Sequence, residues 1–220
     1  MANFNLFELS NFKELIKNSV LKTKIVHQSD HAEDLFTIAL GLCAAVKKIY
    51  FERSEDVFSC EPVIEKTLII QFMRRMRIDG MEKFNQTTFV SAVHFYKDAA
   101  AAASNLPIGV LIVYIERKFV PEMLRLFKYP YIDYDDDTEV LDGIGAIANL
   151  IAGQFKKELV HLGYPDLEMF HFKSYINSVA NGVEYPSDQT HKYKISFEID
   201  DKKRMVMEMV MSPLPKQVAV

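Results

Sequence analysis

Residues 138–161 read TEVLDGIGAIANLIAGQFKKELVH, and this stretch carries the strongest structural signal in the chain. Its apolar residues recur at steps of three and four, which is the period of an α-helix. They form one broad apolar face, which we expect to pack against a sheet. That face consists of Val140, Ile144, Ile147, Ile151, Phe155 and Leu159.

A second stripe, on the far side of the predicted helix, is made of small or singly polar residues. It consists of Asp142, Ala146, Asn149 and Gly153. A solvated helix face usually carries Lys, Glu and Gln, and a glycine inside a helix costs about 1 kcal/mol relative to alanine. The stripe therefore indicates that something approaches this helix closely. On these residues alone, another element of the chain and a binding partner are equal alternatives.

The overall composition is that of an ordinary folded protein. The chain has 220 residues, of which 49% are hydrophobic and 25% charged, so disorder is not expected. Its 26 Lys and Arg against 30 Asp and Glu give a net charge of −4, which argues against nucleic-acid binding. The longest uncharged apolar run, residues 99–115, contains Asn105 and Pro107, which argues against a membrane span. Because the N-terminus has no secretion signal, we expect a cytoplasmic protein.

The cysteine, histidine and carboxylate spacings predict no metal site. Cys43 and Cys60 form no C-x-x-C pair, so we interpret both as reduced structural thiols. His27 and His31 are four residues apart, but no third ligand stands nearby. The acidic run at residues 133–139 lacks the glycine and glutamate positions of an EF-hand loop. We interpret it instead as the N-terminus of the following helix, where negative charge is favourable and Asp136 or Asp137 is the cap.

The segments around the central helix predict an α+β fold. Before it we expect strands at residues 87–96 and 107–115, a helical turn within 97–105 and a short helix at 119–127. After it we expect strands at residues 167–176, 192–199 and 205–211, with a hairpin connection at 200–203. Four methionines share one face of the last strand, at positions 205, 207, 209 and 211. We favour a role in the core for them over a partner-binding surface.

The first eighty residues predict helices. Ser10 is a candidate cap for a short amphipathic segment, and Asp30 with Glu33 has the spacing of a capping box before a helix that runs to about residue 52. A further helix is expected at residues 62–79, with an apolar stripe of Val63, Ile64, Leu68, Phe72 and Met76. We therefore divide the chain into a helical extension (1–80), an α+β domain (81–212) and a flexible tail (213–220).

The run from Leu141 to Gly163 resembles the signature helix of the CheC/CheX/FliY family of chemotaxis phosphatases, and CheX most of all. The similarity rests on N-L-I-A-G at residues 149–153 and on the ending K-E-L-V-H-L-G. The order of predicted elements over residues 81–212 agrees with that family. The resemblance implies a CheC/CheX-like mixed sheet with packed long helices. It also implies that the partner is the phosphorylated receiver domain of a CheY-type response regulator, from whose aspartyl-phosphate the family removes phosphate.

The resemblance also assigns roles to the stripe. Asn149 takes the catalytic position, which orients the attacking water, and Asp142 takes the position of an acidic or serine residue in the family pattern. The family glutamate, which pairs with the active-site lysine of the receiver, falls on Ala146, and the Ala-Gly pair of the pattern ends at Gly153. Because the receiver supplies the metal, no cofactor is implied. A proline that often follows the helix in the family is also absent, with Phe170 in that neighbourhood.

The first functional hypothesis is therefore a CheX-like receiver-binding protein whose phosphatase activity is weak or lost, because Ala146 has no polar atom to replace the carboxylate. The alternative is a non-enzymatic structural or regulatory module, which presents this helix face or the methionine strand to another partner or to a second copy in a homodimer. A third hypothesis concerns the N-terminal helices, which would cover the sheet, mediate a dimer or mask the Asn149 stripe.

Overall fold

The structure is a computed structural model that describes residues 30–53, 57–130, 132–177 and 181–213. The helices in these ranges are α2 (Asp30–Arg53), α3 (Gly80–Phe84), α4 (Ala99–Ala103), α5 (Val120–Leu126) and α6 (Asp137–His161), with a 3-10 turn η1 (Arg117–Phe119). The strands are β1 (Val63–Leu68), β2 (Gln71–Phe72), β3 (Arg75–Ile78), β4 (Thr88–Tyr96), β5 (Gly109–Glu116), β6 (Glu168–Asn177), β7 (Asn181–Val183), β8 (His191–Ile199) and β9 (Lys202–Met211).

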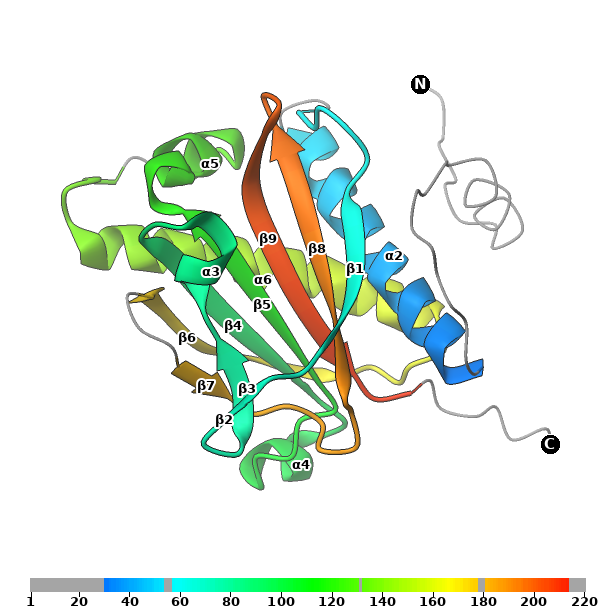
Figure 1. The fold of residues 1–220 in the computed structure, drawn as a ribbon. Helices are drawn as coiled ribbons and strands as arrows, with labels where there is room; N and C mark the ends of the chain where they lie inside the picture. Colours follow the sequence, from blue (N-terminus) through cyan, green and yellow to red (C-terminus); the bar gives the residue numbers. More distant parts are fainter. Residues whose placement is uncertain (1–29, 54–56, 131, 178–180, 214–220) are drawn as a thin grey trace.

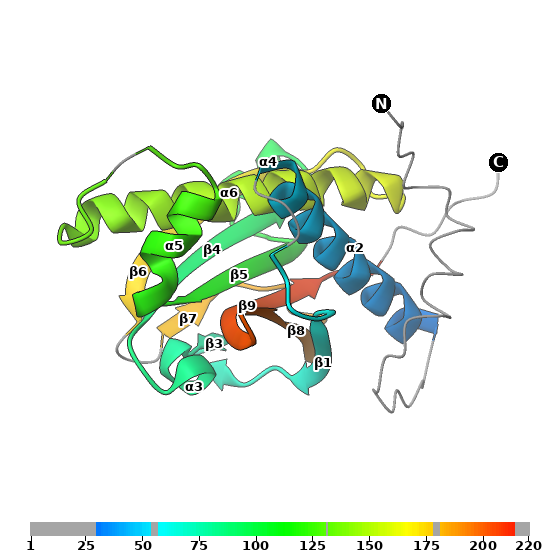
Figure 2. The ribbon, with the colours of Figure 1, turned by 90° about the horizontal axis from the view of Figure 1, so that it is seen from above.

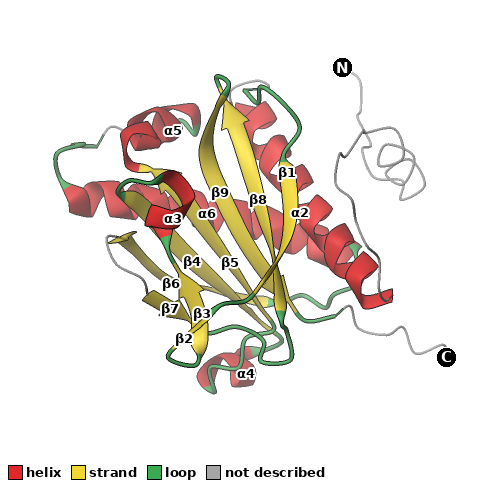
Figure 3. Ribbon diagram, viewed as in Figure 1, coloured by secondary structure: helices red, strands yellow, loops and turns green. Residues whose placement is uncertain are grey.

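These elements form three layers (Figure 1). The middle layer is a six-stranded sheet with the order β1-β8-β9-β5-β4-β6. The helices α2, α5 and α6 cover one face, while α3 and a small sheet of the order β2-β3-β7 lie on the other, as the view from above shows (Figure 2). Figure 3 shows the same separation, with the long helices behind the strands. The expected α+β fold with packed long helices is therefore confirmed.

Alternation along the central strands creates two apolar cores, one on each face of the six-stranded sheet. On β9, the methionines at positions 205, 207, 209 and 211 pack on the helix side, while Val206 and Val210 pack toward the small sheet. All four methionines are fully buried. The prediction that they fill a core is confirmed. By the same alternation, Glu208 lies on the side of the small sheet.

Every strand pairing among the described residues is antiparallel, whereas we expected a mixed sheet. The short connections explain this in part, since β8 and β9 are joined by a two-residue turn. In that turn Ile199 pairs with Lys202, and both Asp200 and Asp201 have positive φ, at 51° and 55°. The hairpin predicted at residues 200–203 is thus confirmed.

The prediction of a helix at residues 62–79 is wrong, because this segment forms β1, β2 and β3. β1 pairs with β8, and β3 pairs with β7, so the segment supplies one edge of the large sheet and part of the small sheet. Of the supposed helical stripe, Ile64 and Met76 are buried while Val63, Leu68 and Phe72 are exposed. This alternation is that of a strand, which buries every second side chain.

The other predicted elements are present within a few residues of the expected bounds. They are α2, β4, α4, β5, α5, α6, β6, β8 and β9. The short strand β7 was not predicted. The Ser10 segment, His27 and residues 214–220 lie outside the described residues, as do the side chains of Asp30 and Glu33. Within the described ranges, no helix combines the length and the apolar character that a membrane span requires.

The division of the chain at residue 80 stays a prediction, and the contacts across that position are extensive. Helix α2 belongs to the same apolar core as α6, with Ile38, Leu42 and Val46 fully buried. On β1, Ile64 pairs with Ile195 of β8. The described part of the first eighty residues therefore packs into the α+β core.

Candidate functional site

Helix α6 begins at a dedicated cap. The side chain of Asp136 accepts a hydrogen bond of 2.8 Å from the backbone N–H of Thr138, so Asp136 and not Asp137 is the cap. Asp137 instead pairs with Arg117 at 3.0 Å, and Glu139 accepts from the backbone N–H of Asp133 at 2.7 Å. These carboxylates lie at the positive end of the helix dipole. The acidic run therefore fixes the start of the helix, as expected.

The apolar face of α6 packs as the sequence predicts. All six of its residues are buried: Val140, Ile144, Ile147, Ile151, Phe155 and Leu159. Phe95 of β4 meets Phe155 edge to face, with ring centroids 5.7 Å apart. This anchors the helix on the sheet and leaves its opposite side pointing away from the core.

The four residues of the small stripe lie on that opposite side. Asp142 is exposed, and Ala146, Asn149 and Gly153 are partly exposed. No described residue forms a hydrogen bond or ion pair with the side chains of Asp142 or Asn149. The structure thus brings the four predicted site residues together on one accessible helix face.

Two glycines show that the faces of α6 differ in how closely they are packed. A Cβ atom built on Gly143 would lie 2.9 Å from Cδ2 of Leu124, so α5 approaches the helix closely there. A Cβ atom on Gly153 would meet nothing within 4 Å. Close packing within the described chain therefore explains Gly143 but not Gly153. Helix α2 packs beside α6 without covering Gly153.

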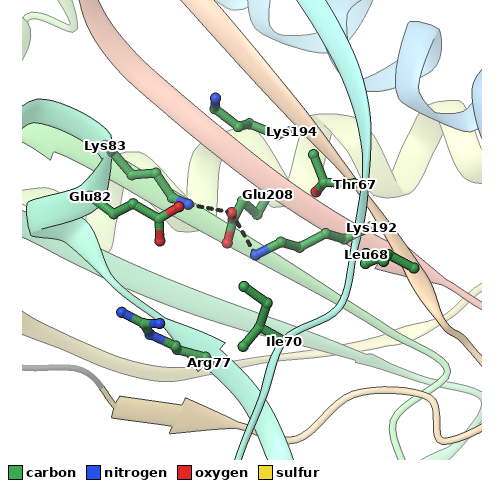
Figure 4. Close-up of a pocket in the computed structure, with 9 residues that line it drawn as sticks. All are labelled: Thr67, Leu68, Ile70, Arg77, Glu82, Lys83, Lys192, Lys194 and Glu208. Atoms are coloured by element: carbon green, nitrogen blue, oxygen red, sulfur yellow. Dashed lines mark ion pairs between the residues drawn. The ribbon is translucent and has the colours of Figure 1, made fainter.

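A second group of polar side chains lies on the other face of the sheet (Figure 4). Oε1 of Glu208, on β9, lies 2.8 Å from the ammonium nitrogen of Lys83 on α3 and 2.7 Å from that of Lys192 on β8. The hydroxyl of Tyr114 donates a 2.6 Å hydrogen bond to Oε2 of the same carboxylate. The Glu208 side chain has no exposed surface, and those of Lys83 and Lys192 are only 6% and 9% exposed.

Burial and neighbouring charges act in opposite directions on the pKa values of Glu208 and Lys192, and in the same direction on that of Tyr114. Burial raises the pKa of Glu208, but the ammonium groups of Lys192 and Lys83 outweigh it and hold that pKa below its ordinary value. Burial lowers the pKa of Lys192, and the Glu208 carboxylate offsets this only in part. The pKa of Tyr114 is raised well above its ordinary value by burial and by the neighbouring carboxylate. The two ammonium groups therefore favour the ionised form of the Glu208 carboxylate, while Tyr114 is held in its neutral, hydrogen-bond-donating form.

The sequence does not single out this cluster, because Lys83 and Tyr114 come from α3 and β5, which lie far along the chain from the β8–β9 hairpin that carries Lys192 and Glu208. One signal was present: Glu208 is the one charged residue in the apolar run of residues 205–211. As for metals, no group of three or more His, Cys, Asp or Glu side chains in the described ranges is placed to hold an ion. Both cysteines are free thiols, Cys43 buried and Cys60 exposed.

Comparison with solved structures finds CheX and FliM structures of low sequence identity. CheX from Desulfovibrio desulfuricans is 12% identical, with a TM-score of 0.44 over 80% of this chain and 99% of that one. The FliM middle domain from Vibrio alginolyticus is 13% identical, with a TM-score of 0.46 over 81% and 93%. A CheX from Borrelia burgdorferi, solved in a complex with CheY, BeF3 and Mg, is 11% identical, with a TM-score of 0.41 over 84% and 99%.

The chain is similar in fold to CheX. No family model matches the sequence, and no curated protein matches it either.

Proposed function

We propose that the chain binds the phosphorylated receiver domain of a CheY-type response regulator through the stripe Asp142, Ala146, Asn149 and Gly153. The observation that carries this proposal is the accessible Asn149, on a helix face where the side chains of Asp142 and Asn149 have no partner among the described residues. Gly153 leaves open space beside it, so a partner's backbone can approach the helix. This arrangement supports a docking face better than an unspecialised solvated surface.

The chemistry of an asparagine suits the catalytic step that the family resemblance implies. A carboxamide has both a donor and an acceptor, so it can hold a water molecule in line with phosphorus without transferring a proton. Phosphoryl transfer depends mainly on such positioning and on charge stabilisation, and the receiver with its metal supplies the latter. Asn149 is therefore the residue to which we assign any remaining phosphatase activity.

The proposed activity is weak because Ala146 offers no carboxylate to the receiver's lysine. Asp142 lies one turn earlier on the same face, and neighbouring residues at this spacing are about 5–6 Å apart between Cβ atoms. Its side chain is one methylene shorter than that of a glutamate, so it reaches the same lysine less well. Binding without efficient dephosphorylation is the expected outcome.

Binding is tested with receiver domains from the same organism, each measured with and without phosphorylation by titration calorimetry. We expect at least one phosphorylated receiver to bind the wild-type chain. Gly153→Leu should abolish that binding by filling the open space on α6. Ala103→Leu adds three of the same four side-chain carbons at an exposed position of α4 and should leave the binding unchanged. Absence of binding to every phosphorylated receiver would refute the proposal.

Activity is tested by release of inorganic phosphate from the receiver that binds. Ala146→Glu should raise the rate, because it restores the carboxylate that docks the receiver's lysine. Asn149→Ala in the same background should remove the gain while leaving binding largely intact. If Ala146→Glu binds the phosphorylated receiver but releases no phosphate, the chain is a receiver-binding protein without the catalytic function assigned to Asn149.

A further inference from the structure

The cluster around Glu208 lines a cavity between the six-stranded sheet and the segment that runs from β1 to α3 (Figure 4). The cavity has a volume of about 130 Å³, which is enough for several water molecules at roughly 30 Å³ each, or for one small ligand. Its lining is Thr67, Leu68, Ile70, Arg77, Glu82, Lys83, Lys192, Lys194 and Glu208. The cavity is on the face of the sheet opposite to α6, so it is separate from the stripe of Asn149.

Positive charge exceeds negative charge at the base of this cavity. The buried ammonium groups of Lys83 and Lys192 share the single carboxylate of Glu208. The other carboxylate of the lining, that of Glu82, is exposed, where solvent and salt weaken its influence. One buried positive charge is thus left without a buried counter-charge.

Several buried polar atoms of the lining have no hydrogen-bond partner among the described residues. The hydroxyl of Thr67 and Nε of Arg77 are both buried and have no hydrogen-bond partner among the described residues. The two contacts at Oε1 of Glu208 are ion pairs whose angles depart from those of a hydrogen bond. Each ammonium group has three N–H donors, so Lys83 and Lys192 keep donors for a further acceptor. Buried donors without partners are costly.

We propose that this cavity binds a small molecule through an oxyanion, either a carboxylate or a phosphate group. Such a group brings acceptors and negative charge, which suit the two buried ammonium groups that share one carboxylate and the unpartnered donors of Thr67 and Arg77. Lys83 and Lys192 supply the charge, while Thr67 and Arg77 of the lining each carry a buried donor without a partner. Glu208 holds the two ammonium groups in place and is a positioning residue.

The test uses the full chain and titration calorimetry with sodium phosphate and with sodium acetate, at constant ionic strength set by sodium chloride. We expect at least one of the two anions to bind, and the one that does identifies the head group. Thr67→Val removes one unpartnered donor without touching the ion pairs, and it should weaken the binding about tenfold. Thr138→Val, at an exposed position of α6, is the matched control and should bind as the wild type does.

Lys192→Met gives a second variant that keeps the fold, because it leaves Glu208 paired one to one with Lys83. It should weaken anion binding by at least about tenfold, while Lys118→Met, which removes an exposed charge on η1, should not. The proposal is overturned if neither anion binds the wild type. It is equally overturned if Thr67→Val and Lys192→Met both bind the anion with wild-type affinity, since the binding is then elsewhere.

Discussion

The ammonium nitrogen of Lys192 lies 2.7 Å from Oε1 of Glu208, and Lys83 approaches the same oxygen to 2.8 Å from the other side. This places a fully buried carboxylate at the centre of a sheet whose neighbouring side chains, Val206 and Val210, are apolar. A buried charge in such surroundings persists only when it is paired, so the three charges depend on one another.

Replacing Glu208 by glutamine should therefore destabilise the protein strongly. Glu208→Gln keeps the shape of the side chain but leaves two buried ammonium groups without a counter-charge, a loss of about 3–5 kcal/mol in the free energy of unfolding. Urea denaturation measures it. The control is Glu65→Gln, whose carboxylate pairs with Lys194 at 2.8 Å on a half-exposed surface, and which should cost less than about 1 kcal/mol. Equal losses would show that the buried cluster is not a stability determinant.

The same carboxylate should make the stability depend on pH in the acid range. Because the folded-state pKa of Glu208 is lowered, the unfolded chain takes up a proton first as the pH falls. The stabilisation is complete above the unfolded pKa of glutamate, about 4.3, and is lost as the pH falls through the folded value. Unfolding free energies measured from neutral pH down to acid should show a smaller loss in Glu208→Gln than in wild type. Parallel curves would contradict this assignment.

Much of the fold could be predicted from local sequence patterns, because a long helix or strand repeats its apolar period several times. The helix α6 displays its apolar period over several turns, and the acidic cap before it marks the start, so its bounds and its two faces could be predicted from the sequence. The stripe of Asp142 and Asn149 was found for the same reason: residues on one helix face are set by spacing alone. The roles assigned to them came from the family resemblance.

The strands within residues 62–79 could not be predicted from their apolar period, because each of them is short. Over such short runs, apolar residues at steps of three and four also match a helix. The turn between β2 and β3 gives no signal either: Phe72 pairs with Arg75, and the two turn residues, Met73 and Arg74, have positive φ of 51° and 63°. Such turns favour Asn and Gly, and this one has neither.

The Glu208 cluster was missed for a different reason. Lys192 and Glu208 lie on the two strands of the predicted β8–β9 hairpin, but Lys83 comes from α3, which only the packing of that helix brings beside them. A lone glutamate between methionines indicates a buried charge, but no local sequence pattern identifies the residues that pair with it. Long-range pairings of this kind depend on topology, which a local pattern does not encode.

The cap of α6 gives a third prediction. Asp136→Ala removes the acceptor of the 2.8 Å hydrogen bond from the Thr138 N–H, and should lower the unfolding free energy by about 1 kcal/mol. Asp135→Ala removes an equal charge one residue earlier, at an exposed position, and should have a much smaller effect. Urea denaturation compares the two. If both variants lose the same amount, the charge matters and the hydrogen bond does not.

The two glycines of α6 give opposite predictions for the same substitution. Gly153→Ala should raise the unfolding free energy by about 0.5–1 kcal/mol, because alanine favours the helix and the added methyl group meets nothing within 4 Å. Gly143→Ala has the same gain in helix propensity but places its methyl group 2.9 Å from Cδ2 of the buried Leu124. The clash should offset the gain, so this variant should be less stable than Gly153→Ala.

Urea denaturation of the two variants, side by side with wild type, measures this difference. Since both substitutions add one methyl group to the same helix, any difference between them reports the surroundings and not the helix itself. A gain at Gly153 but not at Gly143 would mean that the fold accommodates alanine at position 153. The native glycine would then make the protein less stable than the fold permits. Residues that are suboptimal for stability are expected where a surface serves binding. A loss of stability at Gly153 would instead mean that a further segment of the chain packs against the stripe, and would count against the docking role of this helix face.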